Sequence, residues 1–403
     1  MEVNYADVAI VGAGIIGSTL ATCLSQAGVK TVLIDRFLLS EFVSAAYDGR
    51  GSAISNGSKT ILEGMGIWKS LAAEAEPILS IRVADGWSPL FLNFDCQDVG
   101  KGPLGWIIEN GVIRQSLGRV LGDSQVKIFE RTEVEKIEFT AEEVILRTGC
   151  GPKVTARLAV AADGRQSLLR RLAGIKALEW DYPQTAIVCT VQHELSHLGI
   201  AHEHFYSSGP FAILPMTGRR SSIVWTERTA KAVKLMKMDD RQFLNELQLR
   251  FGEFLGQIRL QSQRWSYPLS LTHAQSYTGR RVALAGDAAH AIHPIAGQGL
   301  NIGIRDIAAL AEVIVDNLRL GLDPGQSAAL RDYEKWRQHD TQLMVTATDS
   351  LNYLFSNNIL PLRLMRDLGL GTVNHLKPIK RMLMRRAMGI SGKLPRLARG
   401  EPL

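Results

Sequence analysis

The chain has 403 residues, of which 46% are hydrophobic and 21% are charged, with 37 glycines. This composition excludes a disordered or fibrous protein and predicts a globular one, long enough for about two domains. The net charge of +6 is concentrated at the C-terminus: from Lys377 onward there are eight Lys or Arg against one acid, Glu401, a net of +7 that leaves about −1 for residues 1–376. We therefore exclude a nucleic-acid-binding surface spread over the molecule, and favour a local basic patch for an acidic surface.

The sequence has no signal peptide and no apolar run of about 18 residues. We therefore expect a cytoplasmic protein without a membrane-spanning helix. The four cysteines, Cys23, Cys96, Cys150 and Cys189, show no C-x-x-C spacing and fall mostly in apolar surroundings. We expect them to be reduced thiols.

The first 35 residues have the pattern of a βαβ unit. Asp7–Val11 predicts a strand, a helix follows, and Thr31–Ile34 predicts a second strand that ends at Asp35. The turn between the first strand and the helix reads Gly12-Ala13-Gly14-Ile15-Ile16-Gly17. In such a turn the first glycine allows a tight bend, the second lets the backbone approach a pyrophosphate, and the third lets helix and strand pack; the acid binds ribose hydroxyls. The motif predicts a dinucleotide site without separating FAD from NAD.

Residues 36–178 contain two further groups of polar residues. The loop Asp48–Ser55 includes Arg50 and precedes a helical stretch, for which Ser55 or Asn56 is a suitable N-cap. A small apolar strand, Leu158–Ala162, ends in the pattern D-G-x-x-S-x-x-R over residues 163–170. This pattern alone is also compatible with a capped helix start. Between the two groups, residues 78–110 read as edge strands, Ile113–Leu121 as a helix with Arg114 near its start, and Thr132–Phe139 with Val144–Thr148 as a hairpin.

From Trp180 to Leu271 the pattern is that of an antiparallel sheet. Strands are predicted at Thr185–Val191, Phe211–Pro215, Ser221–Trp225 and Arg264–Leu271, with one around Phe205 and one helix near Phe243–Phe251. His193-Glu194-Leu195-Ser196-His197 matches the H-E-x-x-H zinc motif, which requires a helix. The preceding run predicts a strand instead, and the extended motif fails because Ile200 and Glu203 stand where it needs Gly and His. We therefore predict no metal site.

The stretch Arg281–Ala308 combines a strand, a Gly-Asp turn, a loop and a helix. Val282–Ala285 ends at Gly286-Asp287, which places the Asp287 carboxylate at a strand's C-terminal end, where it can accept hydrogen bonds from ribityl hydroxyls. The loop His293–Gly299 then leads into a helix that begins near Leu300. Its free N-terminal amides suit an anion, and the N1–C2=O edge of a reduced isoalloxazine is one.

The last segment, Ile359–Met388, alternates apolar and basic residues. Two interpretations stay open: the segment packs on the preceding domain, or it lies on an anionic bilayer surface.

The three motifs, in this order and spacing, resemble those of the aromatic-ring flavin monooxygenases. The strings Gly-Asp-Ala-Ala-His and His-Pro-x-Ala-Gly-Gln-Gly-Leu-Asn make the chain resemble in particular the ubiquinone-biosynthesis FAD-dependent hydroxylase family. The resemblance implies an α/β fold with a Rossmann-like FAD-binding domain like that of para-hydroxybenzoate hydroxylase, an antiparallel β-sheet substrate domain and a C-terminal helical segment. The implied boundaries are 1–77, 111–178 and 276–345 for FAD, 78–110 and 179–275 for substrate, and 346–403 for the basic segment.

The resemblance also implies the site residues. The expected FAD contacts are Gly12, Ala13, Gly14, Ile15, Ile16, Gly17, Asp35, Arg36, Arg50, Arg114, Val134, Asp163, Asp287, Pro294, Gly297, Gly299, Leu300 and Asn301. The expected substrate contacts are Phe211, Leu214, Pro215 and Trp225, for which core packing is an equally good interpretation. For Arg114 a surface position is an alternative.

The implied function is hydroxylation of a polyprenylated phenol in ubiquinone biosynthesis through a flavin C4a-hydroperoxide, with O₂ as co-substrate. Such chemistry needs no side-chain nucleophile or metal, so we name no catalytic residue. A second G-x-G-x-x-G is absent from the sequence, so the electron donor, NAD(P)H or a reductase or ferredoxin, must visit the flavin. The alternatives are a small-aromatic hydroxylase or polyprenyl reductase on the same fold, and a non-catalytic flavin-binding subunit of a membrane-associated complex. We also expect peripheral attachment to the inner face of the membrane or to a ubiquinone-biosynthesis complex, and no nucleic-acid partner.

Overall fold

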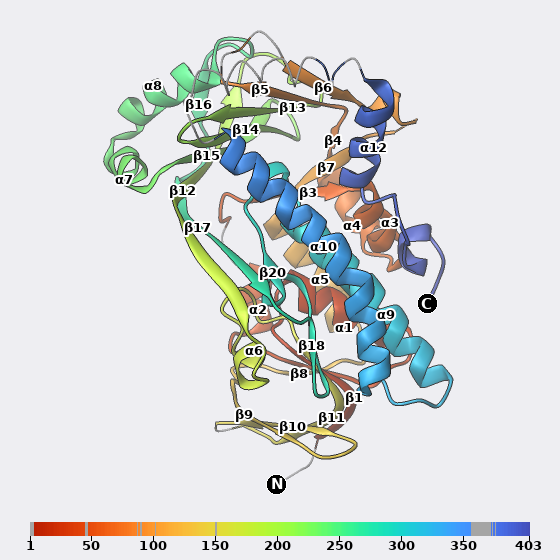
Figure 1. Ribbon diagram of the computed structural model, residues 1–403. Helices are drawn as coiled ribbons and strands as arrows, with labels where there is room; N and C mark the ends of the chain where they lie inside the picture. The colour runs from red at the N-terminus through yellow and green to blue at the C-terminus, as the bar shows by residue number, and fades with distance from the viewer. Residues whose placement is uncertain are drawn as a thin grey trace.

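The computed structural model of the chain describes residues 4–44, 47–86, 88, 91–100, 102–149, 151–355, 372, 374 and 376–403. Figure 1 shows an elongated molecule with one large sheet at each end and two long helices, α9 (Gly299–Arg319) and α10 (Ser327–Phe355), running along one side. In the part of the chain that the structure describes, no helix is both long and apolar enough to cross a bilayer.

The first sheet has eight strands, in the order β18-β19-β11-β1-β2-β8, with the β9–β10 hairpin attached to β11. Its strands are β1 (Asn4–Val11), β2 (Thr31–Ile34), β8 (Lys127–Phe129), β9 (Val134–Phe139), β10 (Val144–Thr148), β11 (Val154–Ala161), β18 (Thr278–Gly279) and β19 (Val282–Leu284). The five central strands, β19 to β8, are parallel. They are short and almost wholly apolar because helices or neighbouring strands cover both of their faces. The βαβ unit and the hairpin are confirmed.

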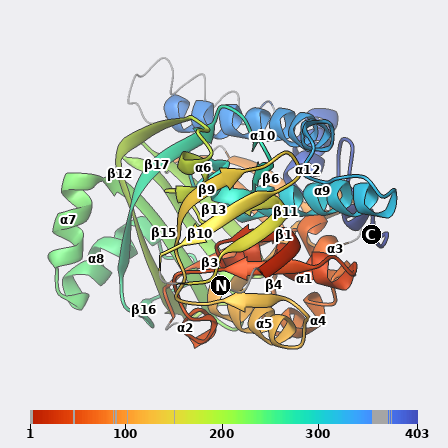
Figure 2. The same cartoon turned by 90° about the horizontal axis from the view of Figure 1, so that it is seen from below.

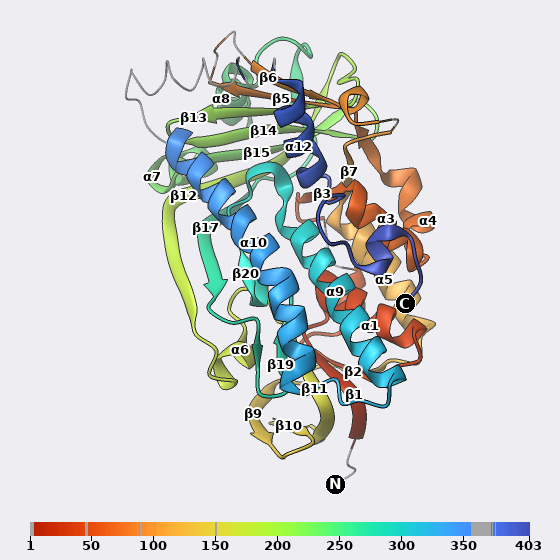
Figure 3. The same cartoon turned by 45° about the vertical axis from the view of Figure 1, so that its right-hand side comes forward.

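The helices α1 (Ile15–Gln26), α5 (Asn110–Gly122), α9 and α10 form one layer against this sheet. Helix α1 packs between α9 and α5, and α10 runs beside α9, as Figure 3 shows. Helix α9 is buried along nearly two thirds of its length, with apolar residues such as Ile304, Ile307 and Leu310 in the core. The helix predicted after Gly299 is therefore confirmed, and it is a central element of the fold.

The second sheet has nine strands, in the order β20-β17-β12-β15-β14-β13-β5-β6, with β16 beside β12. Its strands are β5 (Ser80–Asp85), β6 (Phe91–Asp95), β12 (Ala177–His193), β13 (Ile200–Tyr206), β14 (Gly209–Met216), β15 (Arg220–Arg228), β16 (Ile258–Leu260), β17 (Trp265–Ala274) and β20 (His290–Ala291). Two helices, α7 (Thr229–Lys237) and α8 (Asp240–Phe251), cover its outer face, away from the first sheet (Figures 1 and 2). The strand β12 begins eight residues before the predicted one because its N-terminal half pairs with β17 next to the first sheet.

A small sheet of β3 (Gly51–Ser55), β4 (Glu76–Ile78) and β7 (Gly105–Glu109) lies between the two large sheets. The remaining helices are α2 (Leu39–Ser44), α3 (Asn56–Gly64), α4 (Trp68–Leu71), α6 (Leu168–Leu172) and α12 (Lys377–Ala387). Short 3₁₀ turns lie at Ala72–Glu74, Cys96–Asp98, Gly286–Ala288, Ile295–Gly297 and Arg396–Arg399. The Ser55 side chain caps α3 by accepting a hydrogen bond from the Ser58 amide, as the sequence suggested.

The C-terminal part of the chain differs from the sequence-based expectations in two respects. The boundary expected between residues 345 and 346 falls inside α10, which is continuous from Ser327 to Phe355. The predicted segment Ile359–Met388 lies partly outside the described residues, and its described part forms α12. Of the cysteines, Cys23, Cys96 and Cys189 are free thiols, and Cys150 lies outside the described residues.

Candidate active site

A large cavity lies between the two main sheets. Its volume is about 1460 Å³, above the roughly 300–1,000 Å³ of pockets that hold one drug-sized ligand. The glycine turn after β1, the strand β3 and the loop from Asp287 to Asn301 form one end. The inner face of the nine-stranded sheet forms a wall, and the end of α10 and the inner side of α12 line the rest. The cavity therefore has room for a cofactor and a second molecule.

The glycine turn has the geometry that the motif predicts. Gly12 has φ +103°, and a Cβ there would lie 2.4 Å from the Ala162 carbonyl oxygen, so only glycine fits. A Cβ at Gly17 would lie 1.8 Å from the Gly12 oxygen. A Cβ at Gly14, by contrast, would have no atom within 4 Å, and Gly14 borders the cavity with Ile15 and Ile16. The space in front of Gly14 is therefore open to a ligand.

The loop Asp287–Asn301 borders the same end of the cavity. Asp287, Pro294, Gly297, Gly299, Leu300 and Asn301 all line it. The Asp287 carboxyl is open to the cavity but enclosed by protein; this burial raises its pKa, and nearby Arg165 opposes the rise. Helix α9 begins here, and the first amides of a helix have no partners within it.

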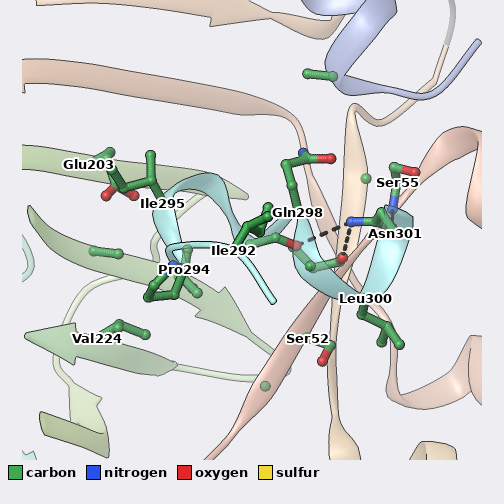
Figure 4. A pocket seen from close by; sticks show the side chains of 18 of the residues that line it. Ser52, Ser55, Glu203, Val224, Ile292, Pro294, Ile295, Gln298, Leu300 and Asn301 are labelled. Atoms are coloured by element: carbon green, nitrogen blue, oxygen red, sulfur yellow. Dashed lines mark hydrogen bonds between the residues drawn. The ribbon is translucent and has the colours of Figure 1, made fainter. Parts of the chain in front are cut away.

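Asn301 holds this loop against β3. Its side-chain oxygen accepts a hydrogen bond from the Ser55 amide at 2.8 Å, and its Nδ2 donates to the Ala53 carbonyl at 2.7 Å. The same nitrogen donates to the Gly297 carbonyl at 3.2 Å, as the dashed lines of Figure 4 show in part. Gly297 has φ +60° and packs close to Ala53. The Asn301 side chain therefore fixes the shape of the site by holding backbone groups of β3 and of the loop together.

Two arginines line the cavity, one directly before β3 and one on α5. Arg50 and Arg114 both line it and share the Asp48 carboxylate, at 2.7 and 3.1 Å. Burial alone would raise the pKa of Asp48, but hydrogen bonds from Arg50 lower it. Arg114 is buried, and among the described residues its Nε and Nη2 atoms have no hydrogen-bond partner. A buried guanidinium with two unused donors is a site for an anionic group such as a phosphate.

Seven of the expected cofactor contacts do not line the cavity: Gly12, Ala13, Gly17, Asp35, Arg36, Val134 and Asp163. Asp35 accepts hydrogen bonds from the amides of Ala13 and Phe37, so it fixes the glycine turn. Arg36 is exposed and lies over the Phe37 ring. Both oxygens of Asp163 accept hydrogen bonds from the start of α6, which matches the capping interpretation of that motif. Direct contact of these side chains with a dinucleotide stays a prediction.

The comparisons with known proteins decide the family. A model of the FAD-binding-domain family matches residues 5–348. Ubiquinone hydroxylase UbiL of Rhodospirillum rubrum is 47% identical, over 99% of this chain and 94% of the relative. The 3-demethoxyubiquinol 3-hydroxylase of Escherichia coli is 32% identical over 95% of this chain and 98% of the relative. The chain belongs to the ubiquinone-hydroxylase family of FAD-dependent monooxygenases. A solved structure, p-nitrophenol 4-monooxygenase PnpA of Pseudomonas putida, shares the fold with a TM-score of 0.80 at 20% identity, covering 98% of this chain and all of that one.

The cavity residues of this monooxygenase fit FAD. The open space at Gly14, the unused donors of Arg114 and the free amides at the start of α9 are three independent binding features for a long, anionic cofactor. Arg114 and Gly14 would hold the pyrophosphate arm, Asp287 the ribityl chain, and α9 the edge of the flavin ring.

The substrate wall corrects three of the four residues expected there. On β14, Pro210, Ala212 and Leu214 face the cavity, so Phe211 and Pro215 point to the other side of the sheet. The Phe211 and Trp225 rings pack edge to face at 6.0 Å beneath α7 and α8. The assignment of Phe211, Pro215 and Trp225 to the substrate cavity is therefore wrong, and Leu214 lines the cavity as expected.

Sequence reasoning missed two acids of this site. Glu203 on β13 lines the cavity, and its neighbour in Figure 4 is Ile295 from the flavin loop. Asp306 on α9 is fully buried and accepts hydrogen bonds from the Gly286 amide, His290 and Arg337, so it anchors the Gly286–Asp287 turn from below. Burial alone would raise the pKa of Asp306, but the charges of His290 and Arg337 lower it.

The H-E-x-x-H residues lie at the end of β12 and in the turn that follows, as the strand prediction indicated. His193 contacts the Leu195 carbonyl at 2.6 Å and the Ser221 hydroxyl at 3.1 Å. His197 contacts the Met216 carbonyl at 2.9 Å and accepts a hydrogen bond from the Gly199 amide at 3.1 Å. All four imidazole nitrogens therefore have partners within the protein.

Proposed function

We propose that this monooxygenase hydroxylates the aromatic ring of a polyprenylated phenol in ubiquinone biosynthesis, using O₂ and electrons from NAD(P)H or from a reductase or ferredoxin. The observation that carries the proposal is the apolar part of the cavity beyond the flavin loop. It runs along the inner face of the nine-stranded sheet as far as α12. The names of the two relatives, a ubiquinone hydroxylase and a demethoxyubiquinol hydroxylase, support the same substrate class.

The wall of this cavity suits a lipid-like ring. The inward residues of the central strands are Ala186, Val188, Leu214 and Val224, with Ser222 and Thr226 as neutral polar groups. Arg50, Arg114 and Arg165 lie at the cofactor end instead, and Arg386 borders the cavity from α12, outside the sheet wall. A small aromatic acid would need a cation beside its carboxylate, and the described residues of these strands offer none on this face. An uncharged phenol with an apolar tail needs no such cation.

The chain contributes binding, orientation and exclusion of water. Reduced FAD, when bound, supplies the activation of O₂. The sheet wall holds the ring against the loop at Pro294, which fixes the distance to the reacting centre. The apolar lining keeps water from the site, and the first amides of α9 stabilise negative charge that develops on a flavin.

The direct test uses isotopically labelled O₂. Enzyme reduced anaerobically is mixed with labelled O₂ and ortho-geranylphenol, and the product is analysed by mass spectrometry. We expect one labelled atom in a new ring hydroxyl. The same phenol without its geranyl group is the matched comparison, and we expect its turnover to be much weaker because it leaves the apolar cavity unfilled. Label from water, or the absence of hydroxylated product from every prenylphenol tried, contradicts the proposal.

We further propose that α12 attaches the enzyme to an anionic bilayer surface. Its inner side, with Met384 and Met388, lines the cavity, and Lys380 is paired with Asp98 at 2.6 Å. Its outer side exposes Ile379 and Met382 together with Lys377, Arg381 and Arg385, while the exposed residues Leu383 and Arg386 also border the cavity. Basic residues beside exposed apolar ones bind an anionic interface. A bilayer at this place would lie beside the end of the cavity where a prenyl tail enters.

Flotation with liposomes tests this attachment. Deleting α12 would open the cavity, so we reverse two exposed charges with Arg381→Glu and Arg385→Glu. The control reverses two exposed lysines on α7 with Lys234→Glu and Lys237→Glu, on the opposite side of the molecule in Figure 1. We expect salt-sensitive binding to anionic vesicles for the wild type and the α7 variant, and its loss in the α12 variant. Equal, salt-insensitive flotation of all three contradicts electrostatic attachment.

A further inference from the structure

Glu203 occupies the middle of the substrate wall. It lies on β13 between Val83 of β5 and Ala212 of β14, and Ala212 in turn pairs with Val224 of β15. Residues paired in this way share one face of a sheet, so Glu203 is the single acid in a row of apolar side chains that face the cavity. A carboxyl in such a row costs stability unless it has a use.

The carboxyl of Glu203 is not used by the fold. Among the described residues, no hydrogen bond or ion pair to its side chain is found. The rings of its sequence neighbours have other contacts: His202, which also borders the cavity, packs on Phe254, and His204 contacts the Gly86 carbonyl. Another acid on the same face of the sheet is Asp85, which pairs with Phe205 two residues along. Burial alone raises the pKa of Glu203 to about 8.

The position of Glu203 relative to the flavin loop is equally specific. Phe205, two residues further along β13, packs with Ile295 and Phe355. Figure 4 shows the Glu203 side chain beside Ile295, on the cavity side of β13. The carboxyl therefore faces the space between the loop Pro294–Gly297 and the substrate wall, where the ring of a bound phenol lies in the proposed function.

We propose that Glu203 is a catalytic residue that accepts the proton of the substrate's phenolic hydroxyl. This inference rests on the proposed function. The phenol O–H bond breaks and a carboxyl O–H bond forms, so a phenol and a carboxylate become a phenolate and a neutral acid, and no electrons are transferred. A phenolate ring is more electron-rich than a phenol and reacts faster with an electrophilic oxygen.

A base of this kind works best when its pKa is close to the working pH and also close to the pKa of the phenol, which is near 10. An ordinary glutamate is too weak a base for a phenol by several pKa units. The apolar surroundings raise the pKa of Glu203 without a charged partner. None of the side chains around it ionises, namely Val83, Ala212, Val224 and Ile295, so burial alone sets this pKa.

The test compares Glu203→Gln and Glu203→Asp with a remote control that has the same loss of charge, Glu253→Gln in an exposed turn. The first readout uses oxidised enzyme, without turnover: ortho-geranylphenol is added and its ultraviolet difference spectrum recorded. Because the pKa of Glu203 lies about two units below that of the phenol, we expect a small phenolate band, on the order of 1% of the bound phenol, without proton release to the buffer for the wild type and Glu253→Gln. For Glu203→Gln we expect binding of the neutral phenol only.

The second readout is the pH profile of single-turnover hydroxylation. The wild-type rate should rise with pH and level off above about 8, where Glu203 is ionised. Glu203→Gln should lose about 10²–10⁴-fold in rate together with the pH limb, and Glu203→Asp should keep the limb at a reduced rate. Thermal unfolding confirms that the variants are folded.

The outcomes separate the two proposals. A phenolate band or an unchanged pH limb in Glu203→Gln overturns the role of Glu203 and leaves the proposed function intact. A phenolate band in the wild type, with no hydroxylated product from any prenylphenol, overturns the proposed function and keeps the proton acceptor.

Discussion

Replacing Gly14 by valine should abolish FAD binding without destabilising the apoprotein. The Gly14 backbone has φ −64° and ψ −178°, which any residue adopts, and a Cβ there meets no protein atom within 4 Å. The added side chain therefore projects only into the space that we assign to the pyrophosphate. Gly17→Ala is the matched comparison, because its Cβ would lie 1.8 Å from the Gly12 oxygen and must displace the turn.

The expected sizes follow from linkage. FAD at a free concentration of 100 times its Kd stabilises the wild type by about 2.7 kcal/mol, or about 3 °C in Tm for a chain of this size. Apo Gly14→Val should unfold within about 1 kcal/mol of the wild-type apoprotein, and added FAD should not shift its Tm. Gly17→Ala should lower the stability of the apoprotein itself by about 1–3 kcal/mol or more.

The assay is thermal unfolding of the apoproteins with and without FAD, together with the FAD content after purification. Stoichiometric FAD in Gly14→Val shows that the pyrophosphate lies elsewhere. A loss of apoprotein stability in Gly14→Val as large as that in Gly17→Ala shows that the open space at Gly14 is filled by protein, and either result refutes the reasoning.

Three further expectations concern single residues. Asp306→Ala should lower the free energy of unfolding in urea at pH 7 by about 3–5 kcal/mol because it removes one of the two carboxylates that pair with the buried Arg337. Since the pKa of Asp306 is lowered in the fold, the advantage of the wild type is present above pH about 4 and lost in stronger acid. Equal stability at pH 7 would count against this reasoning. Glu203→Gln should have the same Tm as the wild type below pH 4.5 and an increasingly higher Tm toward pH 8. The reason is that the pKa of Glu203 is raised in the fold, so the wild type loses stability as pH rises through that range. Plots of Tm against pH that run parallel for the two proteins contradict this. Dialysed protein should hold no stoichiometric zinc by elemental analysis, and one equivalent that disappears in His193→Ala would falsify our interpretation of that motif.

Much of the fold follows from short-range patterns. Runs such as Val8–Val11 and Leu158–Ala161 are apolar throughout because both faces are covered, and the glycine turn identifies the first of them as the start of a βαβ unit. On β14 the alternation places Phe211 and Leu214 on opposite faces of the sheet, although both were expected to contact the substrate. It cannot say which face is covered by α7 and α8, since a cavity and a helix layer select the same apolar residues. Phe211, Pro215 and Trp225 were therefore assigned to the wrong face.

The two acids were beyond sequence reasoning for a different reason. Glu203 enters the sequence argument only as a residue that breaks an extended zinc motif, and its importance comes from Val83 and Ala212, which are distant in the chain. Asp306 did carry a signal, a charge on the buried side of an apolar helix. Its partners His290 and Arg337 become visible only when α10 lies against α9.

The strand order has a consequence for the synthesis of this enzyme. In the parallel sheet β1 pairs with β11, and β11 pairs with β19, so residues near 4, 154 and 282 become neighbours. The glycine turn leaves the ribosome early, but the loop that completes the site ends at Asn301. At about 5–20 residues per second this interval lasts about 15–60 s. During that time a nascent chain has no complete cofactor site, and from the synthesis of β11 until that of β19 it carries an apolar, unpaired edge of β11. Flavin therefore stabilises only the finished molecule, and limited flavin supply should lower the yield of folded enzyme after translation, not during it.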